Sequence, residues 1–371
     1  MASVYRHGRR WRASVVLPTG HRTTRVFEFK ADADAWARQI ESDADRGKWT
    51  DPTAGRQLFS SYAAEWIEAQ RWRPSTREQA DSHLRRWILP AFGHLPIGSI
   101  TNTQVRAFVT HLDEHLSPNT VESVYRRVVA VFEGAVADRV IAINPATARK
   151  IELPKAPPRE ATQLVNLDVH DVTRLAGVVL PWMSAFVWCG AMSGLRPGEI
   201  AGLAIEAIDW EESALKVDRQ LSTVRGGPRL APPKTRASYR TVPVPDRLLQ
   251  ILREHSNTFP PVEVPDPLSP GTSRSLVFSN RDGRPHRRNG LSDAWRRGAQ
   301  QASLVPEADG WHQLRHFYVS ALIDAGASVK TVQARMGHSS AQETLQTYAS
   351  LWPTADDSTR AAISAVFESN A

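Results

Sequence analysis

The sequence predicts a multidomain, mainly α-helical protein with a small β-plus-helix unit, an all-helical domain and a mixed α+β domain. Three observations predict this fold class. A basic segment of alternating polarity opens the chain, four helical stretches with short connections follow it, and the remainder mixes helices with a short β-rich stretch. A length of 371 residues allows two or three domains with separate cores. We place the domains at residues 1–50, 57–148 and 166–371, with a linker at 149–165.

Charge and composition narrow the class of protein. The chain has 46 Lys and Arg against 39 Asp and Glu, and a net charge of +7 favours a polyanionic partner, nucleic acid first. No apolar run is long enough to span a membrane, and the N-terminus lacks the apolar segment of a secretory signal. The single cysteine, Cys189, cannot form an internal disulfide, and its apolar surroundings predict a buried, inert thiol. We therefore expect a cytoplasmic protein.

The first 50 residues form the β-plus-helix unit. Strands are predicted in "WRASVVL" and "TTRVFEF", which the turn "PTGHR" joins, and a helix in "ADADAWARQIESDADRG" is expected to end at Gly47. Basic residues dominate the segment, and Arg9, Arg10 and Arg12 are the expected DNA contacts. A solvated basic appendage is the alternative.

The all-helical domain follows. One of its four helices is predicted to begin at an N-cap, Ser75, and to end before Pro90, and the last begins after Ser117. Its arginines suggest contacts with DNA, although a purely structural four-helix bundle has the same pattern. The candidates for DNA contact are Arg73, Arg126 and Arg127.

A proline-rich basic stretch, "NPATARKIELPKAPPREATQ", resists packing and predicts the linker. Beyond it, strands are expected in "LKVDRQLST", "YRTVPVP" and "SLVFSN". Residues 259–275 are rich in proline and are expected to form a loop.

Two motifs of the last domain carry isolated basic residues. In "SGLRPGEIAGL", Gly194 ends one helix and Pro197 starts the next, so Arg196 is held at a helix start with Glu199 one turn later. In "PPKTRASYRTVPVP", Lys234 is expected near the tip of a β-hairpin. Taken singly, Arg196 reads as a structural partner of Glu199, and Lys234 as a solvated lysine.

Two further motifs carry histidines. In "WHQLRHFYVSALI", His312 and Arg315 share a helix face, and His316 is spaced from His312 as a metal pair would be. Gln313 stands where a zincin has glutamate and no third ligand is evident, so no metal is expected.

The other motif is "SVKTVQARMGHSSAQETLQTYASL". One helix ends at Met336, His338 lies at the break, and a second helix carries Tyr348. Taken alone, Tyr348 reads as an ordinary half-buried helical aromatic.

In this order the motifs resemble those of the tyrosine recombinase, or phage integrase, family across the whole C-terminal part. Gln313 departs slightly, since many relatives have aspartate there. The helical segment resembles the family's SAM-like core-binding domain, and the basic N-terminal unit is similar to its arm-binding domains. The matching positions are Arg196, Lys234, His312, Arg315, His338 and Tyr348.

The resemblance implies a reaction that needs neither metal nor other cofactor. The Tyr348 oxygen would attack a DNA phosphodiester and leave a 3′-phosphotyrosyl link with a free 5′-hydroxyl. It implies that Arg196 and Arg315 stabilise the charged transition state, that His312 accepts the tyrosine proton and that Lys234 protonates the leaving oxygen. His338 would donate one more hydrogen bond to the phosphate.

The resemblance also implies partners. We expect double-stranded DNA attachment sites, a homotetramer on DNA, and accessory proteins such as a host DNA-bending factor and an excisionase, with the protein associated with the bacterial nucleoid. A helical stripe in the tail is expected to dock on a neighbouring subunit, or alternatively on its own domain; it comprises Ala361, Ile363, Val366 and Phe367. The alternatives to a mobile-element integrase are a chromosome-dimer-resolving recombinase, a type IB topoisomerase and a non-catalytic DNA-binding protein.

Overall fold

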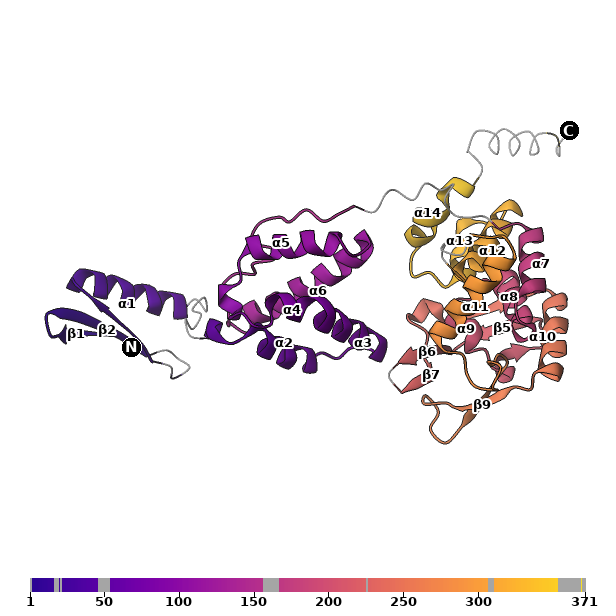
Figure 1. The fold of residues 1–371 in the computed structure, drawn as a ribbon, viewed down its shortest axis with the longest axis horizontal. Helices are drawn as coiled ribbons and strands as arrows, with labels where there is room; N and C mark the ends of the chain where they lie inside the picture. The colour runs from indigo at the N-terminus through magenta and orange to yellow at the C-terminus, as the bar shows by residue number, and fades with distance from the viewer. Residues whose placement is uncertain are drawn as a thin grey trace. The chain divides into compact units, whose positions relative to one another are not determined.

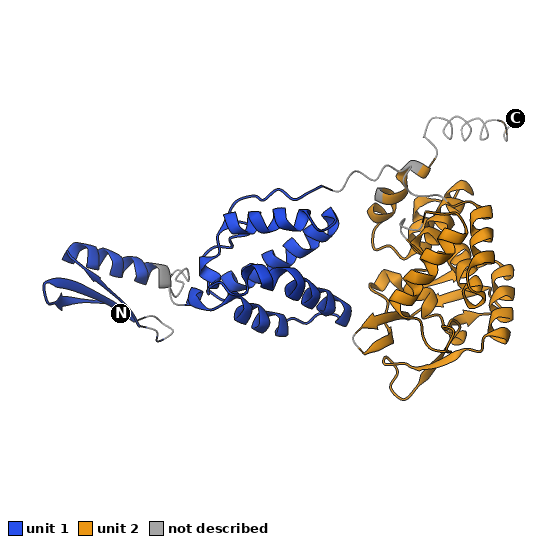
Figure 2. Ribbon diagram, viewed as in Figure 1, with its two compact units in different colours: residues 1–157 blue, residues 158–371 orange. Residues whose placement is uncertain are grey.

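A computed structural model shows the chain as two compact units, residues 1–157 and 158–371 (Figure 2). The break between the units falls within the stretch for which the linker is predicted. The tail stripe and the larger part of that linker lie outside the described residues. The structure describes residues 2–16, 20, 22–45, 54–155, 167–224, 226–305, 310–352 and 368.

The N-terminal part of the first unit is an antiparallel sheet with one helix (Figure 1). Its elements are β1 (Ala2–His7), β2 (Arg10–Val16), β3 (Arg22–Phe27) and α1 (Lys30–Asp45). Small apolar side chains of β2 and α1, among them Ala13 and Ala37, form its core. The predicted β-plus-helix fold is confirmed, but β1 was not predicted. Gly47, the predicted helix end, lies outside the described residues.

The rest of the first unit is helical and has its own core. Its elements are η1 (Ala54–Arg56), α2 (Phe59–Glu68), α3 (Pro74–His83), the π-helical turn η2 (Leu84–Ile88), α4 (Leu89–Phe92), η3 (Ile97–Ser99), α5 (Asn102–Asp113) and α6 (Pro118–Ala137). Phe59 lies at the centre of the core, where its ring packs against those of Phe92 and Phe132. The aromatic face of α2 therefore packs against α4 and α6 in this core.

The predicted limits of the second helix are wrong at both ends. The N-cap position is Arg73, and Pro74 takes the first helical position, so Ser75 lies inside the helix. The helix also continues past Pro90. Proline cannot donate a backbone hydrogen bond. Pro90 lies in the first turn of α4, where the π-helical hydrogen bonds of η2 give way to α-helical ones.

The second unit surrounds the apolar helix α8 (Pro181–Ser193) with helices on several sides and small antiparallel sheets. Cys189 of α8 is buried, as predicted, and burial raises the pKa of its thiol to about 12. No helix in the described part of the chain is both long enough and apolar enough to cross a bilayer. The other helices are α7 (Val169–Val178), α9 (Pro197–Ala201), η5 (Ile205–Ala207), η6 (Arg236–Ser238), α10 (Asp246–Thr258), α11 (Arg288–Gln301), α12 (His312–Asp324), α13 (Val329–Met336), α14 (Ala341–Tyr348) and η7 (Ala349–Leu351).

The described strands of this unit form three separate sheets, in the orders β4-β5-β8, β6-β7 and β10-β9. The predicted loop at 259–275 is wrong, because β9 and β10 pair within it. Ion pairs of Arg219 with Asp266 at 2.9 Å and of Arg274 with Asp218 at 3.1 Å tie the hairpin to the chain between β5 and β6. The strands are β4 (Ile208–Asp209), β5 (Ala214–Val217), β6 (Gln220–Val224), β7 (Gly227–Ala231), β8 (Arg240–Pro243), β9 (Val262–Pro265) and β10 (Ser273–Leu276).

A buried histidine makes the second unit sensitive to acid. Burial, and next the charge of His255, lowers the pKa of His286 to about 4, whereas an unfolded histidine titrates near pH 6.5. Between these values the unfolded chain binds a proton that the folded chain does not, so stability is lost as the pH falls from about 6.5 to about 4. We expect the urea midpoint of this unit to be lower at about pH 5.5 than at about pH 7.5. The difference between the two midpoints should be smaller in His286→Gln. Equal midpoints for the wild type at the two pH values would contradict this reading.

Candidate active site

A glycine turn places Arg196. Gly194 caps α8 in the left-handed conformation, with φ of 62°, and an added Cβ would lie 2.3 Å from a ring carbon of Tyr318. Only glycine fits this close approach. Arg196 then occupies the N-cap position of α9, directly before Pro197. The predicted placement of this arginine at a helix start is what the structure has.

Glu199 is the buried carboxylate of the site, at 3% exposure. It accepts hydrogen bonds from the backbone N–H and Nη1 of Arg196 at 2.9 and 3.0 Å, and from Nη1 and Nη2 of Arg240 at 3.2 and 2.8 Å. Burial alone would raise its pKa, but the hydrogen bonds and charge of Arg240, followed by the charges of Arg196 and Arg315, lower it. Glu199 therefore stays ionised and orients two guanidinium groups.

Arg315 is the most enclosed cation of the site, at 4% exposure. Its Nη1 donates to the carbonyl oxygen of Gly194 at 2.6 Å, and its Nη2 donates to the carbonyl oxygen of Met336 at 2.6 Å and to Nε2 of His338 at 3.2 Å. Burial and the nearby charge of Arg196 lower its pKa to about 9, so the side chain remains charged at neutral pH. These contacts use three of its five N–H groups.

His338 is fixed by a second glycine turn. Gly337 ends α13 with φ of 62°, and an added Cβ would lie 2.9 Å from the carbonyl oxygen of Ala237. Because arginine can only donate, Nε2 of His338 accepts from Arg315, and its Nδ1 carries the proton and donates to the Thr344 hydroxyl at 2.8 Å. Burial and the charge of Arg315 lower the pKa of His338 to about 4, so it is neutral at pH 7.

Tyr348 is the last residue of α14 and is 2% exposed. Its ring packs in a small apolar cluster with Val319 and Met336, among others. Its hydroxyl lies 2.6 Å from Nδ1 of His316, the residue directly after Arg315 on α12. The tyrosine is therefore a core residue whose hydroxyl contacts the helix that carries Arg315.

Two expected residues lie on the surface. His312, at the start of α12, is exposed. Lys234 is also exposed and follows β7, in the connection that leads to β8. The predicted hairpin tip is wrong for Lys234, because β8 pairs with β5 and the intervening β6–β7 hairpin turns at Val224–Gly227 instead.

The sequence reasoning missed three participants. Arg240 of β8 donates hydrogen bonds to Glu199, and His316 contacts the Tyr348 hydroxyl. The hydroxyl of Thr344, a fully buried residue of α14, accepts a hydrogen bond from His338. The sequence did contain a sign of Arg240, because this arginine lies in the predicted strand "YRTVPVP" among apolar residues. His316 had only its helical spacing from His312, which suggested a metal pair instead.

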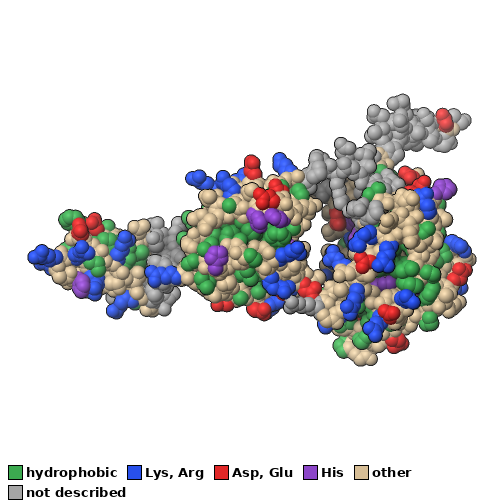
Figure 3. All heavy atoms as spheres, viewed as in Figure 1, with side chains coloured by type: hydrophobic (Ala, Val, Ile, Leu, Met, Phe, Trp, Pro, Cys, Tyr) green, Lys and Arg blue, Asp and Glu red, His purple; other side chains and the backbone are tan. Residues whose placement is uncertain are grey.

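The predicted DNA-contacting arginines lie in the first unit. Arg9, Arg10, Arg73 and Arg126 are exposed, and Arg12 is half-buried; Figure 3 shows Lys and Arg side chains on the visible face of both units. Arg127 stacks over the Trp72 ring at 4.3 Å, and with Arg126 it lines a surface hollow on α6.

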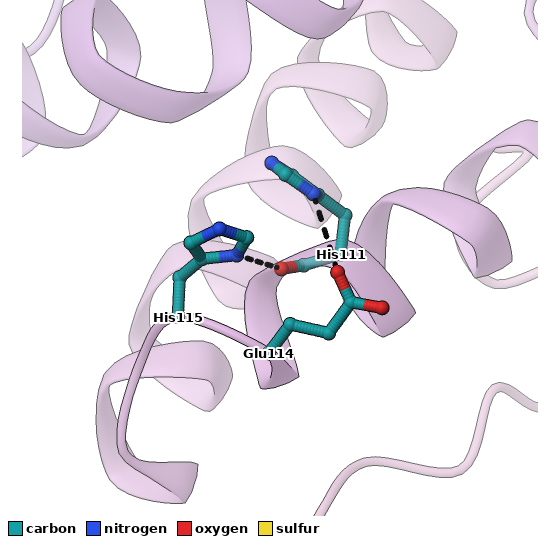
Figure 4. Close-up of side chains that lie close together, drawn as sticks. All are labelled: His111, Glu114 and His115. Atoms are coloured by element: carbon teal, nitrogen blue, oxygen red, sulfur yellow. Dashed lines mark hydrogen bonds and ion pairs between the residues drawn. The ribbon is translucent and has the colours of Figure 1, made fainter.

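A group of possible metal ligands lies at the end of α5. His111, Glu114 and His115 are exposed, and their ligand atoms lie within 4.8 Å of one another (Figure 4). Nδ1 of His115 donates to the carbonyl oxygen of His111 at 2.9 Å, and Nδ1 of His111 pairs with Glu114 at 3.8 Å. These contacts link the three side chains, and such exposed groups are common without an ion.

Comparison with known proteins identifies the second unit and the helical part of the first. The family model for the phage integrase family matches residues 181–353, and that for the phage integrase central domain matches residues 59–151. The chain belongs to the phage integrase family. Its members are tyrosine-type site-specific recombinases, so the resemblance carried by the motifs is confirmed at the level of the family.

Similar proteins match over most of this integrase-family chain. A tyrosine recombinase XerC-like protein of Caldanaerobacter subterraneus is 26% identical over 82% of the chain and 80% of the relative. The integrase of Mycobacterium phage L5 is 26% identical over 84% of the chain and 82% of the relative. A structure of the Tn1549 transposon integrase with a circular intermediate DNA shares the fold, with a TM-score of 0.68, 21% identity, and coverage of 83% and 99%. A lambda integrase tetramer bound to a Holliday junction has a TM-score of 0.58, 15% identity, and coverage of 92% and 96%.

Neutralising Glu199 tests whether it organises the arginines. We expect Glu199→Gln to destabilise the second unit by about 3 kcal/mol, because it leaves buried cations unbalanced. Asp293→Asn removes a carboxylate from an exposed pair with Arg296 and should cost less than about 1 kcal/mol. Thermal unfolding of the two variants measures both effects, and equal small losses would show that Glu199 is dispensable.

Proposed function

We propose that the chain is the integrase of a phage or integrative element, which cleaves and rejoins DNA through a 3′-phosphotyrosyl bond to Tyr348. One observation carries the proposal. Segments far apart in the sequence meet in a single hydrogen-bonded network around Arg315, and the next residue of the same helix contacts the Tyr348 hydroxyl. A purely structural tyrosine needs no such neighbours.

The network suits a phosphodiester. Arg196, Arg240 and Arg315 set three positive charges around the buried carboxylate of Glu199, so the charge around Glu199 is positive overall. Among the residues that the structure describes, three N–H groups of Arg315 have partners, and its two other N–H groups can donate to phosphate oxygens. Donors that are already held in place stabilise the charge that develops on the non-bridging oxygens.

The proposed transfer balances without a metal or a nucleotide. The phenolic oxygen of Tyr348 forms a bond to phosphorus, and its proton passes to a histidine of α12. The bond from phosphorus to the 5′-oxygen breaks, and Lys234, on its exposed connection, gives that oxygen a proton. His338 can donate to the phosphate only after its proton moves to Nε2 or a second proton binds, which the incoming negative charge favours.

The proposed partners follow from the domains. We assign arm-type DNA binding to residues 1–50, core-site binding to residues 57–148 and catalysis to residues 166–371. Assembly as a tetramer on attachment-site DNA is supported by the lambda integrase tetramer, and DNA binding by the Tn1549 integrase complex. A host DNA-bending factor, an excisionase, and a location in the bacterial cytoplasm on the nucleoid belong to the same proposal.

The XerC-like relative raises the alternative of a chromosome-dimer-resolving recombinase. The N-terminal sheet favours the integrase, because the resemblance to dimer-resolving recombinases covers only the helical and catalytic domains. Both alternatives share the same chemistry at Tyr348.

A suicide substrate tests the nucleophile. We expect wild-type protein to form a covalent complex with nicked DNA that carries the attachment core, found as a repeat adjoining the gene. Tyr348→Phe should form none, because only the hydroxyl is removed. Denaturing electrophoresis with labelled DNA measures the complex. Wild-type protein without the complex, or a Phe variant that still forms it, would reject the proposal.

Chelation tests the absence of a metal requirement. We expect EDTA to leave the rate of covalent-complex formation unchanged, since the guanidinium groups supply the charge stabilisation that Mg²⁺ gives in other phosphoryl transfers. Single-turnover cleavage with and without EDTA measures this. A loss of activity that added Mg²⁺ restores would contradict it.

A further inference from the structure

The hydroxyl of Tyr348 makes a direct polar contact with the imidazole of His316. The hydroxyl lies 2.6 Å from Nδ1, and the two ring centroids are 5.5 Å apart. The tyrosine ring is buried, whereas His316 is half-buried. The imidazole therefore lies at the edge of the apolar cluster that holds the tyrosine ring, next to the tyrosine hydroxyl.

His316 directly follows Arg315 on α12, so the contact with the tyrosine lies next to the arginine network. The preceding residue, Arg315, reaches the carbonyl oxygens of Gly194 and Met336, so the helix is fixed against two other segments. Consecutive residues of one helix thus face the expected phosphate and the expected nucleophile. His312, one turn earlier, is exposed.

We propose that His316, and not His312, is the catalytic residue that accepts the proton of Tyr348. This inference rests on the proposed function. As the phenolic oxygen bonds to phosphorus, its proton passes to Nδ1 of a neutral His316, and the 5′-oxygen departs with a proton from another group. When the strand is rejoined, the proton returns to the tyrosine.

Ordinary acidities support this assignment. A free tyrosine has a pKa near 10 and is a weak nucleophile at neutral pH, whereas a free imidazole near 6.5 is largely neutral there and can accept a proton. A positioned general base contributes about 10²- to 10⁴-fold in rate. A distance of 2.6 Å already meets the requirement that the base lie within hydrogen-bond reach.

Matched asparagine variants separate His316 from His312. The assay is single-turnover formation of the covalent complex by the full chain on the nicked attachment-core DNA. We expect His316→Asn to slow it by about 10²-fold or more, because the amide can still hydrogen-bond to the hydroxyl but cannot take its proton. His312→Asn should have the smaller effect, and His170→Asn, at an exposed site on α7, should have none.

A substrate with sulfur in place of the bridging 5′-oxygen distinguishes a base from an acid. Sulfur leaves without needing a proton, so this substrate should restore cleavage by Lys234→Ala but not by His316→Asn. If His316 only supported the fold, His316→Asn would slow cleavage of the oxygen and sulfur substrates equally. It would also lower the thermal midpoint or the affinity for DNA. Restoration of His316→Asn by the sulfur substrate would overturn the proposal.

The wild-type pH profile gives a test that needs no variant. The rate should fall as the pH is lowered from about 7.5 to about 5.5, because a protonated imidazole cannot accept the tyrosine proton, and this limb should be lost in His316→Asn. A wild-type rate that is flat across that range, or a His316→Asn rate within about threefold of wild type, would overturn the proposal while leaving the nucleophile assignment intact. Failure of wild-type protein to form any covalent complex would instead reject the proposed function itself.

Discussion

The site depends on one buried ionic contact, the carboxylate of Glu199 between the guanidinium groups of Arg196 and Arg240. Removing charges from water costs several kcal/mol for each ion unless every lone pair and proton is used. Here four hydrogen bonds fill the carboxylate. Because Arg240 belongs to β8 and Arg196 starts α9, the same contact fixes the sheet to the helix and holds both guanidinium groups beside one carboxylate.

Backbone carbonyls extend this constraint to the rest of the site. Arg315 bonds to the carbonyl oxygens of Gly194 and Met336, and Arg240 bonds to that of Arg335 at 2.7 Å. Helix ends leave such carbonyls without partners inside the helix, so the arginines satisfy them and are oriented by them at once. The glycines at both turns are necessary for this arrangement, since a side chain at either would collide with its neighbours. The same hydrogen bonds therefore end the helices and orient the arginines.

The sequence predicted those parts of the fold and site that local patterns determine. Helix starts at Arg196 and after Ser117, the burial of Cys189 and the end of α13 follow from short-range signals. Features set by tertiary contacts were missed or wrong. The continuation past Pro90 depends on a π-helical turn, and the hairpin within 259–275 depends on ion pairs with distant residues. The partner of the Tyr348 hydroxyl could not be read from spacing, because His312 and His316 lie on one helix face and only packing decides which one meets α14.

The proposed role of Tyr348 as a nucleophile conflicts with its place as a core residue. Reaction requires its oxygen to come within about 3 to 3.5 Å of phosphorus, yet the ring is buried in the described state. The conflict is limited by the size of the cluster, whose buried members are only Val319, Ile323, Val332, Met336 and Tyr348 in the described part of the chain. Small clusters open locally at a lower free-energy cost than a domain core. Arg315 and His316 are neighbours on one helix, so the arginine expected to bind the phosphate and the partner of the hydroxyl belong to the same element. Opening this small cluster would leave the main core of the unit closed.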